Sequence, residues 1–222
     1  LVPSAVIFDL GFINHRVRPG FDDGYAAAKS ASVEFKTGSV GAGTGATAAK
    51  LLGQMFSIKG GIGTASVEVS NGATVGALMV VNAIGDVVNP DTGETVAGPL
   101  TENGFDNSVE LMIKTPSKDT GFFRNTTVGI VATDAKLDKV GATRLAMAGQ
   151  DGIALAIRPA HTANDGDTIF GLSTGTHTEH TSGDTLHAAA LKAVPEAIMN
   201  AIDSAETLGG VLSAKDAKAR FV

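Results

Sequence analysis

Apolar residues recur along this chain with two periods, one typical of strands and one typical of helices. Residues 62–70 alternate polar and apolar side chains, which is the two-residue period of a half-buried strand. Asn71-Gly72 is a hairpin turn signal, and the apolar run 75–81 after it predicts the next strand. Further strands are predicted over residues 127–133 and 168–173, and long helices over residues 137–156 and 186–205. The pattern therefore predicts a mixed α/β layered architecture.

The segments between these elements are rich in glycine and polar residues. A strand is expected over residues 4–10, and a short helix over 24–31, where Asp22 and Asp23 suit the helix N-terminus. A glycine-rich loop at 38–45 leads into an alanine-rich stretch, 46–52, for which we expect one or two helical turns. Residues 100–121 are polar, and we expect an irregular, mobile linker there.

Composition and charge exclude several classes of function. With 222 residues, 43% of them hydrophobic, the chain is long enough to bury a core. Its net charge of −6 gives no basic footprint for nucleic acid or an anionic membrane. The absence of cysteine excludes disulfides, thiol catalysis and thiolate metal sites. No apolar run is long enough to span a bilayer and no signal peptide is visible, so we expect a cytoplasmic protein.

A small polar tripeptide, Asn125-Thr126-Thr127, runs directly into the apolar strand predicted from residue 128 onward. Cleavage of the Asn125–Thr126 bond would give Thr126 a free α-amine beside its own hydroxyl. One residue would then carry both a nucleophile and a base whose ordinary pKa is about 8. Taken alone, the tripeptide is better explained as a β-turn that enters a strand, because such turns are common.

Two carboxylates, Asp165 and Asp167, flank a glycine just before the strand predicted at 168–173. If this stretch is extended, both side chains project on the same face, where they would hold and orient an ammonium group. The alternatives are an Asp-Gly turn or a metal loop. A calcium loop needs more regularly spaced oxygens than this segment offers, so we predict no metal site and no cofactor.

Other motifs favour simpler interpretations. The glycine-rich loop lacks the Gly-Lys-Ser/Thr ending that grips phosphate, and residues 60–63 precede a strand instead of opening a helix. We therefore reject a nucleotide site. His177 and His180 lie three residues apart in a polar loop and are at best a weak metal site. His161 is better placed to orient the Asp165–Asp167 loop than to serve as a triad base, since no serine elbow accompanies it.

Several blocks occur together and in order: Gly41–Ala46, Lys50, Gly60–Ser66, Val80–Asp86, Asn125–Thr127, Ala132–Ala135 and His161–Phe170. They resemble the self-processing aminopeptidase family that includes D-aminopeptidase/esterases, β-peptidyl aminopeptidases and nylon-oligomer (6-aminohexanoate oligomer) hydrolases. The resemblance runs from about Val6 to about Thr174. It implies an αββα sandwich of mixed sheets flanked by helices. Family members carry a further N-terminal portion, so we expect this chain to lack a part that supplies strands and one wall of the site.

The resemblance also implies roles for individual residues. Thr126 is the nucleophile, and Asn82, at the end of a buried strand, stabilises the oxyanion of the tetrahedral intermediate. Lys50 matches the lysine of the nylon-hydrolase group, which would polarise the substrate or tune the amine. Without the resemblance, Asn82 is equally a turn cap and Lys50 a solvated surface charge.

Two further positions separate the branches of the family. The acidic pair Asp165 and Asp167 is similar to the nylon-hydrolase branch, whereas the peptidase branch carries a serine and a glutamate there. Phe8 stands near a position where relatives have a tyrosine whose hydroxyl contributes to the oxyanion site. We count Phe8 as a candidate substrate-binding residue, although its default role is in the core.

We therefore expect an N-terminal-threonine amidohydrolase that cleaves small peptide-like amides, with 6-aminohexanoate oligomers as test substrates. Self-cleavage would give segments 1–125 and 126–222, which remain associated as one domain, and family members assemble as tetramers of such pairs. A β-peptidyl or D-aminopeptidase/esterase is one alternative. A threonine-nucleophile acyltransferase and an unprocessed, inactive scaffold are two others.

Overall fold

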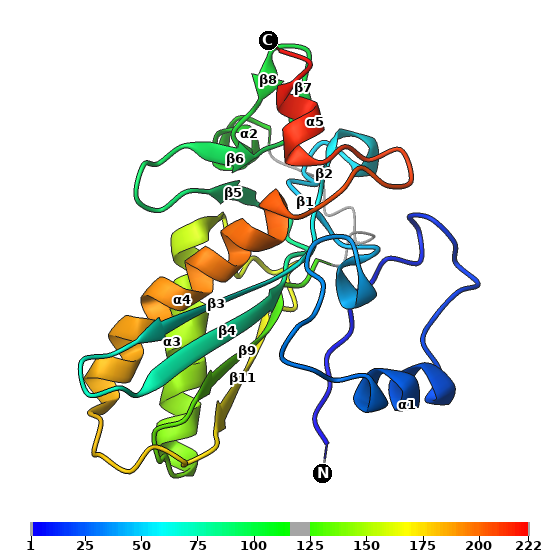
Figure 1. Ribbon diagram of the computed structural model, residues 1–222. Coiled ribbons are helices and arrows are strands. Elements are labelled where there is room, and N and C mark those ends of the chain that lie inside the picture. The colour runs from blue at the N-terminus through cyan, green and yellow to red at the C-terminus, as the bar shows by residue number, and fades with distance from the viewer. Residues whose placement is uncertain (1, 116–124, 222) are drawn as a thin grey trace.

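In the computed structural model, which describes residues 2–115 and 125–221, a four-stranded mixed sheet forms the centre of the chain (Figure 1). Its strands lie in the order β11-β9-β4-β3. Neighbours β3, β4 and β9 are antiparallel, whereas β9 and β11 are parallel. The four strands are β3 (Ile62–Glu68), β4 (Thr74–Val80), β9 (Val128–Thr133) and β11 (Thr168–Ser173).

Two connections give the sheet this topology. β3 and β4 form the predicted hairpin, whose turn places Gly72 at a left-handed φ of 84° that favours glycine. β9 and β11 are joined through helix α3 (Lys139–Ala156), because parallel neighbours need a crossover connection. As a result, β9 and β11 begin side by side, which matters for the residues just before them.

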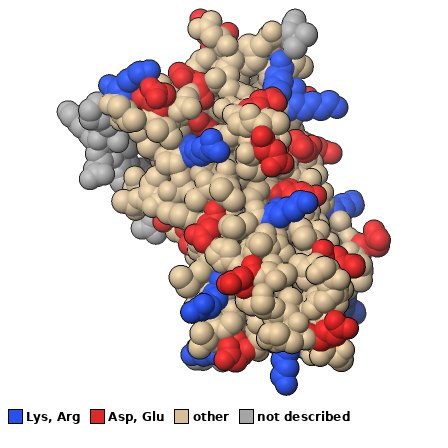
Figure 2. Space-filling model, turned by 90° about the vertical axis from the view of Figure 1, so that its left-hand side faces the viewer, with Lys and Arg blue, Asp and Glu red and all other residues tan. Residues whose placement is uncertain are grey.

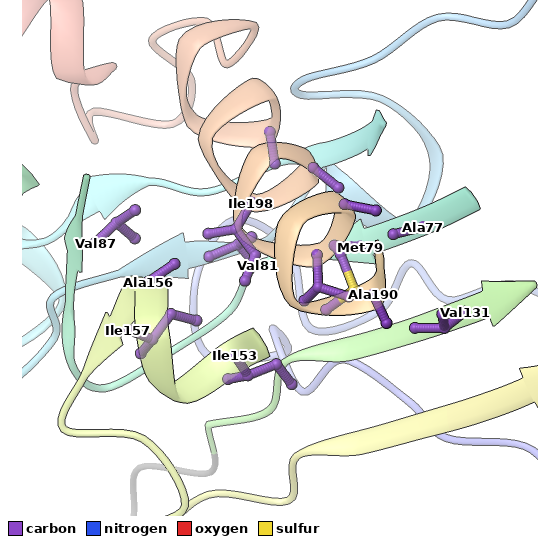
Figure 3. Packing of buried hydrophobic residues seen from close by; sticks show 14 of the residues in the cluster. Ala77, Met79, Val81, Val87, Val131, Ile153, Ala156, Ile157, Ala190 and Ile198 are labelled. Atoms are coloured by element: carbon purple, nitrogen blue, oxygen red, sulfur yellow. The ribbon is translucent and has the colours of Figure 1, made fainter. Parts of the chain in front are cut away.

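Helix α3 and the long helix α4 (Gly183–Asp203) cover one face of the sheet (Figure 1). Alternate strand residues such as Met79 and Val131 belong to one buried cluster with Ile153 of α3 and Ile198 of α4 (Figure 3). Glycine brings the backbones close: a Cβ on Gly63 would lie 2.2 Å from the carbonyl oxygen of Ala197. These contacts fix the sheet firmly against the helices.

Smaller elements surround one end of this sheet. A three-stranded sheet has the order β10-β5-β6, and two further strand pairs are β1-β2 and β7-β8. Their bounds are β1 (Thr47–Ala48), β2 (Ile58–Lys59), β5 (Asp86–Val88), β6 (Thr95–Ala97), β7 (Leu100–Thr101), β8 (Gly104–Phe105) and β10 (Ile157–Arg158). The remaining helices are α1 (Phe21–Lys29), α2 (Ser108–Lys114) and α5 (Ala214–Lys218), with single 3₁₀ turns at Gly41–Gly43 and Gln54–Phe56.

The predicted mixed α/β class, with mixed sheets flanked by helices, is confirmed, as are the four main strands and both long helices. Three local expectations were wrong. Residues 4–10 form no strand, because they pair with no other strand of the described chain. Residues 46–52 are not helical, since Thr47 pairs with Lys59 and Ala49 adopts a left-handed φ of 57°. The stretch 100–115 contains β7, β8 and α2 instead of an irregular linker; residues 116–124 lie outside the described residues.

Acidic and basic side chains are scattered over the face shown in Figure 2, with no gathering of lysine and arginine there. None of the described helices combines the length and apolarity that crossing a membrane requires. The surface thus offers no structural support for a nucleic-acid footprint on this face.

Candidate active site

The Asn125–Thr126 peptide lies at the buried end of the central sheet, immediately before β9. Asn125 is 1% exposed and Thr126 is 9% exposed. The Thr126 amide donates to the carbonyl oxygen of Asn82 at 3.0 Å, continuing the antiparallel pairing of β4 and β9 beyond Val80 and Val128. A threonine in a loop would be solvated, whereas Thr126 is held by a strand-type hydrogen bond at the buried end of the sheet.

The carbonyl group of Asn125 receives two donors. The Gly166 amide donates to it at 2.8 Å, and the Thr126 hydroxyl donates to it at 2.5 Å. Gly166 comes from the loop that precedes β11, which approaches because β9 and β11 are parallel neighbours; Asn125 and Asp165 form a parallel bridge. A Cβ on Gly166 would lie 3.1 Å from the Thr126 hydroxyl oxygen, so the glycine allows this close approach.

Asn82, which follows β4, organises the other side of Thr126. Its side-chain oxygen accepts from Lys50 Nζ at 2.7 Å and from the Thr47 amide at 3.1 Å. Its side-chain nitrogen, by contrast, is buried and has no partner among the described residues. A buried donor without a partner costs about 1–3 kcal/mol, which a bound acceptor would recover.

Lys50 lies 4% exposed, and its Nζ also donates to the Asn82 backbone oxygen at 3.0 Å. Burial lowers the pKa of Lys50 to about 7; the charge of Asp165 opposes this shift and that of Lys59 adds to it. The Lys50 ammonium and the Thr126 amide thus share one acceptor, the Asn82 carbonyl oxygen. Lys50 is therefore a buried lysine close to Thr126, and not the solvated surface charge that was the alternative.

The two carboxylates have different hydrogen-bond partners. Asp165 Oδ2 accepts from the Thr162 hydroxyl at 2.7 Å and the Thr162 amide at 3.1 Å. Burial raises the pKa of Asp165. Asp167 Oδ1 accepts from the Thr127 amide at 2.7 Å, and its Oδ2 lies 2.9 Å from Nδ1 of His161. The orientation of His161 toward this loop agrees with the sequence-based interpretation.

A cavity of about 110 Å³ lies next to these groups. Its lining comprises Phe8, Asp9, Gly11, Phe12, Gly45, Thr47, Lys50, Gln54, Asn82 and Asn125. Phe8 is 43% exposed at the cavity wall, so the default core role was wrong. Phe8 therefore lines the same cavity as Asn82 and Lys50.

Sequence reasoning missed several contributors. The Gly166 amide acts through its backbone, which no residue type reveals. Lys59 is fully buried and donates to the carbonyl oxygens of Gly43, Ala46 and Gly60; burial lowers its pKa to about 8. The position of Lys59 next to the Gly60–Gly61 block was the sequence feature that could have indicated its burial. Among the described residues, no group of three or more histidine, aspartate or glutamate side chains is arranged to hold a metal ion.

Comparison with known proteins places this geometry in a family context. The model of peptidase family S58 matches residues 2–215. An uncharacterized aminopeptidase of Mycobacterium leprae is 38% identical over 242 residues, covering 95% of this chain and 63% of the relative. The 6-aminohexanoate-oligomer endohydrolase of Paenarthrobacter ureafaciens is 29% identical, covering 78% of this chain and 50% of that protein.

Two solved structures have the same fold. A Burkholderia sp. β-aminopeptidase superposes with a TM-score of 0.61 at 25% identity, over 96% of this chain and 62% of its own. The L-aminopeptidase D-Ala-esterase/amidase of Ochrobactrum anthropi, described as a variant of the Ntn-hydrolase fold, gives 0.60 at 24% identity, over 90% and 56%. The chain thus spans about half to three fifths of the length of these proteins.

Proposed function

The chain belongs to peptidase family S58, and from that premise we propose that it is an amide-bond hydrolase whose nucleophile, Thr126, is released by self-cleavage of the Asn125–Thr126 bond. The observation that carries this proposal is the setting of that one peptide bond. Its carbonyl oxygen accepts from the Gly166 amide at 2.8 Å, and the Thr126 hydroxyl lies against the same carbonyl. A buried peptide held in this way is prepared for attack by its own side chain.

Self-cleavage would take two steps, an N-to-O acyl shift and the hydrolysis of the resulting ester. The Thr126 oxygen bonds to the Asn125 carbonyl carbon, the C–N bond breaks, and the hydroxyl proton ends on the Thr126 nitrogen, which leaves an ester. Water then hydrolyses the ester, releasing the Asn125 carboxylate and restoring the Thr126 hydroxyl. The Gly166 amide is the donor that stabilises the negative charge on the Asn125 oxygen.

The same oxygen then serves an external substrate. The Thr126 hydroxyl attacks the substrate carbonyl carbon, the Thr126 α-amine takes its proton, and the leaving amine receives that proton as the C–N bond breaks. Water then hydrolyses the acyl-enzyme and restores the Thr126 hydroxyl. The unpaired side-chain nitrogen of Asn82 is the natural donor for the substrate oxyanion, because it lines the cavity and has no partner among the described residues.

Lys50 is proposed to keep the new α-amine deprotonated. The Thr126 nitrogen and Lys50 Nζ both donate to the Asn82 carbonyl oxygen, at 3.0 Å each. Two ammonium groups this close repel, so a charge on one disfavours a charge on the other. An amine kept neutral in this way is a competent base at neutral pH.

We propose small peptide-like amides as the substrate class, and two relatives suggest where to begin. The name of the Paenarthrobacter relative identifies 6-aminohexanoate oligomers as its substrate, and the Burkholderia structure is that of a β-aminopeptidase. Linear 6-aminohexanoate oligomers and β-amino-acyl amides are therefore the first substrates to test. We further propose that segments 1–125 and 126–222 stay associated and that the processed pairs form tetramers.

The decisive experiment is an intact-mass measurement of the purified chain during prolonged incubation, beside Thr126→Ala. Two fragments that sum to the parent mass plus one water, with Thr126 at a new N-terminus, are expected, and the alanine variant should stay whole. Thr126→Ser keeps a hydroxyl and should cleave. A chain that stays whole at neutral pH, or cleavage of Thr126→Ala at the same bond, would refute the proposed nucleophile.

A further inference from the structure

We propose that His161, with a proton on both ring nitrogens, is a positioning residue that fixes Asp167 and, through Asp167, the backbone directly after Thr126. The hydrogen-bond chain is independent of any activity. Only its consequence for catalysis rests on the function proposed above.

The imidazole ring of His161 bridges helix α3 and the loop before β11. Nδ1 lies 2.9 Å from Asp167 Oδ2, and Nε2 lies 3.1 Å from the carbonyl oxygen of Gln150 in α3. The His161 backbone amide donates to the same Asp167 oxygen at 3.2 Å. His161 therefore contacts the Asp167 carboxylate through its amide and Nδ1, while Nε2 contacts helix α3.

These partners specify where the ring protons lie. A backbone carbonyl oxygen can only accept, so Nε2 must carry a proton to bond Gln150. An ionised carboxylate also only accepts, so Nδ1 must carry a proton to bond Asp167. A neutral imidazole has one proton and would set a lone pair against one of the two acceptors. The imidazolium satisfies both, and the Asp167 side chain, only 5% exposed, gains an opposite charge.

Asp167 passes this restraint to the segment that carries the nucleophile. Its other oxygen, Oδ1, accepts from the Thr127 amide at 2.7 Å, and Thr127 is fully buried. The Gln150 side chain donates to the Asp167 backbone oxygen at 3.3 Å, which holds the aspartate from a third direction. Asp165 is already engaged with Thr162 and does not compete for His161.

The backbone of His161 supports a functional reason for this arrangement. His161 adopts a left-handed φ of 57°, one of two such non-glycine residues in the part of the chain that the structure describes. A side chain in that region is strained, and such strain persists only where the surroundings impose it. Here it brings both the amide and the ring of one residue onto Asp167. A structural turn alone would be served by glycine or asparagine.

The first test is the protonation of the ring in the Thr126→Ala chain, which cannot self-cleave. Nitrogen-15 NMR of labelled histidine, assigned by the signal that His161→Gly removes, reports both ring nitrogens at neutral pH. Two protonated nitrogens are expected, with loss of the Nδ1 proton in Asp167→Asn. A single protonated nitrogen in the parent overturns the proposal, whether or not the enzyme is active.

The second test separates positioning from a general structural role. His161→Gly keeps the left-handed backbone and the amide donor but removes the ring, which is 38% exposed at its side chain and so accessible to a small molecule. Self-cleavage, followed by intact mass, is expected to slow at least tenfold and to recover with added imidazole. 1-Methylimidazole, which lacks one of the two N–H donors, should not restore it. His161→Asn, which tolerates the backbone but offers a donor to Asp167 alone, should be intermediate. Equal rescue by the two compounds, or wild-type cleavage by His161→Gly, contradicts the two-donor role.

Discussion

Replacing Lys50 by methionine tests whether a buried lysine with a lowered pKa lies beside Thr126. Burial in the folded chain holds the pKa of Lys50 at about 7, against its ordinary value of 10.5. The unfolded chain therefore binds more protons than the folded chain between these values. Stability from this group is fully present above 10.5 and is lost as the pH falls toward 7, so wild-type stability must rise with pH in this window.

The size of the effect follows from that shift. A full difference of one bound proton changes the free energy of unfolding by about 1.4 kcal/mol per pH unit. Between pH 7.5 and 9, Lys50 should contribute a rise of about 2 kcal/mol, after allowing for its residual protonation at pH 7.5. Lys50→Met removes this contribution. Lys59, whose pKa is about 8, contributes its own rise and should do so equally in both chains.

Urea unfolding at pH 7.5 and pH 9 measures the difference, in a Thr126→Ala background so that every sample is a single uncut chain. The exposed Lys139→Met is the matched control and should keep the wild-type slope. If Lys50→Met also kept that slope, the buried, low-pKa lysine would be refuted. In the Thr126 chain, Lys50→Met should also slow amide hydrolysis, because the Asn82 side-chain oxygen loses its 2.7 Å donor.

Three further predictions address single groups. Gly166→Pro removes the N–H that donates to the Asn125 oxygen and should slow self-cleavage about 100-fold, as followed by intact mass. Gly166→Ala keeps that N–H and should cleave faster than the proline variant. Equal rates for the two variants would exclude a role for the Gly166 amide in self-cleavage. Asn82→Ala should raise the activation barrier for an amide substrate by about 3 kcal/mol, which lowers kcat/KM about 100-fold. A change in KM alone would argue against an oxyanion role for Asn82. Burial raises the pKa of Asp86 to about 6, so stability from this group is present below its unfolded value of 3.8 and is lost as the pH rises through 6. Asp86→Asn should remove a loss of about 2 kcal/mol between pH 3.8 and 6 in urea unfolding, and an unchanged slope would contradict the burial argument.

Where periodicity was strong, the sequence predicted the fold well. The alternation over 62–70 and the turn at Asn71-Gly72 predicted the β3–β4 hairpin that the structure contains. The predictions failed where pairing partners decide the outcome. Ala46–Leu52 has the alanine content of a helix, yet Thr47 pairs with Lys59 and its amide bonds the Asn82 side chain. Local composition cannot anticipate a partner that is 35 residues away.

The candidate site divides in the same way. The family resemblance singled out Thr126, Asn82 and Lys50 as site candidates, and the structure brings the three together around one carbonyl oxygen. Phe8 was named as a candidate substrate-binding residue, with the core as its default place, and it lines the cavity. The Gly166 amide and Asp9 were not found, because their contributions are not expressed in residue type. Backbone donors and cavity walls depend on which loops meet.

The arrangement of the acidic pair differs from the expected one, and this changes which group we propose to control the α-amine of Thr126. Both carboxylates were expected to hold an ammonium group together. Asp167 instead holds the Thr127 amide and His161, so its charge is already engaged. Asp165 is half-buried, and its charge raises the pKa of Lys50 against the effect of burial. The α-amine of Thr126 would share the Asn82 oxygen with Lys50, not with a carboxylate.

It follows that Asp165 should influence the amine only through the protonation of Lys50. Asp165→Asn should therefore shift the pH profile of hydrolysis in the Lys50 chain but leave that of Lys50→Met unchanged, and a shift in both would show a direct contact.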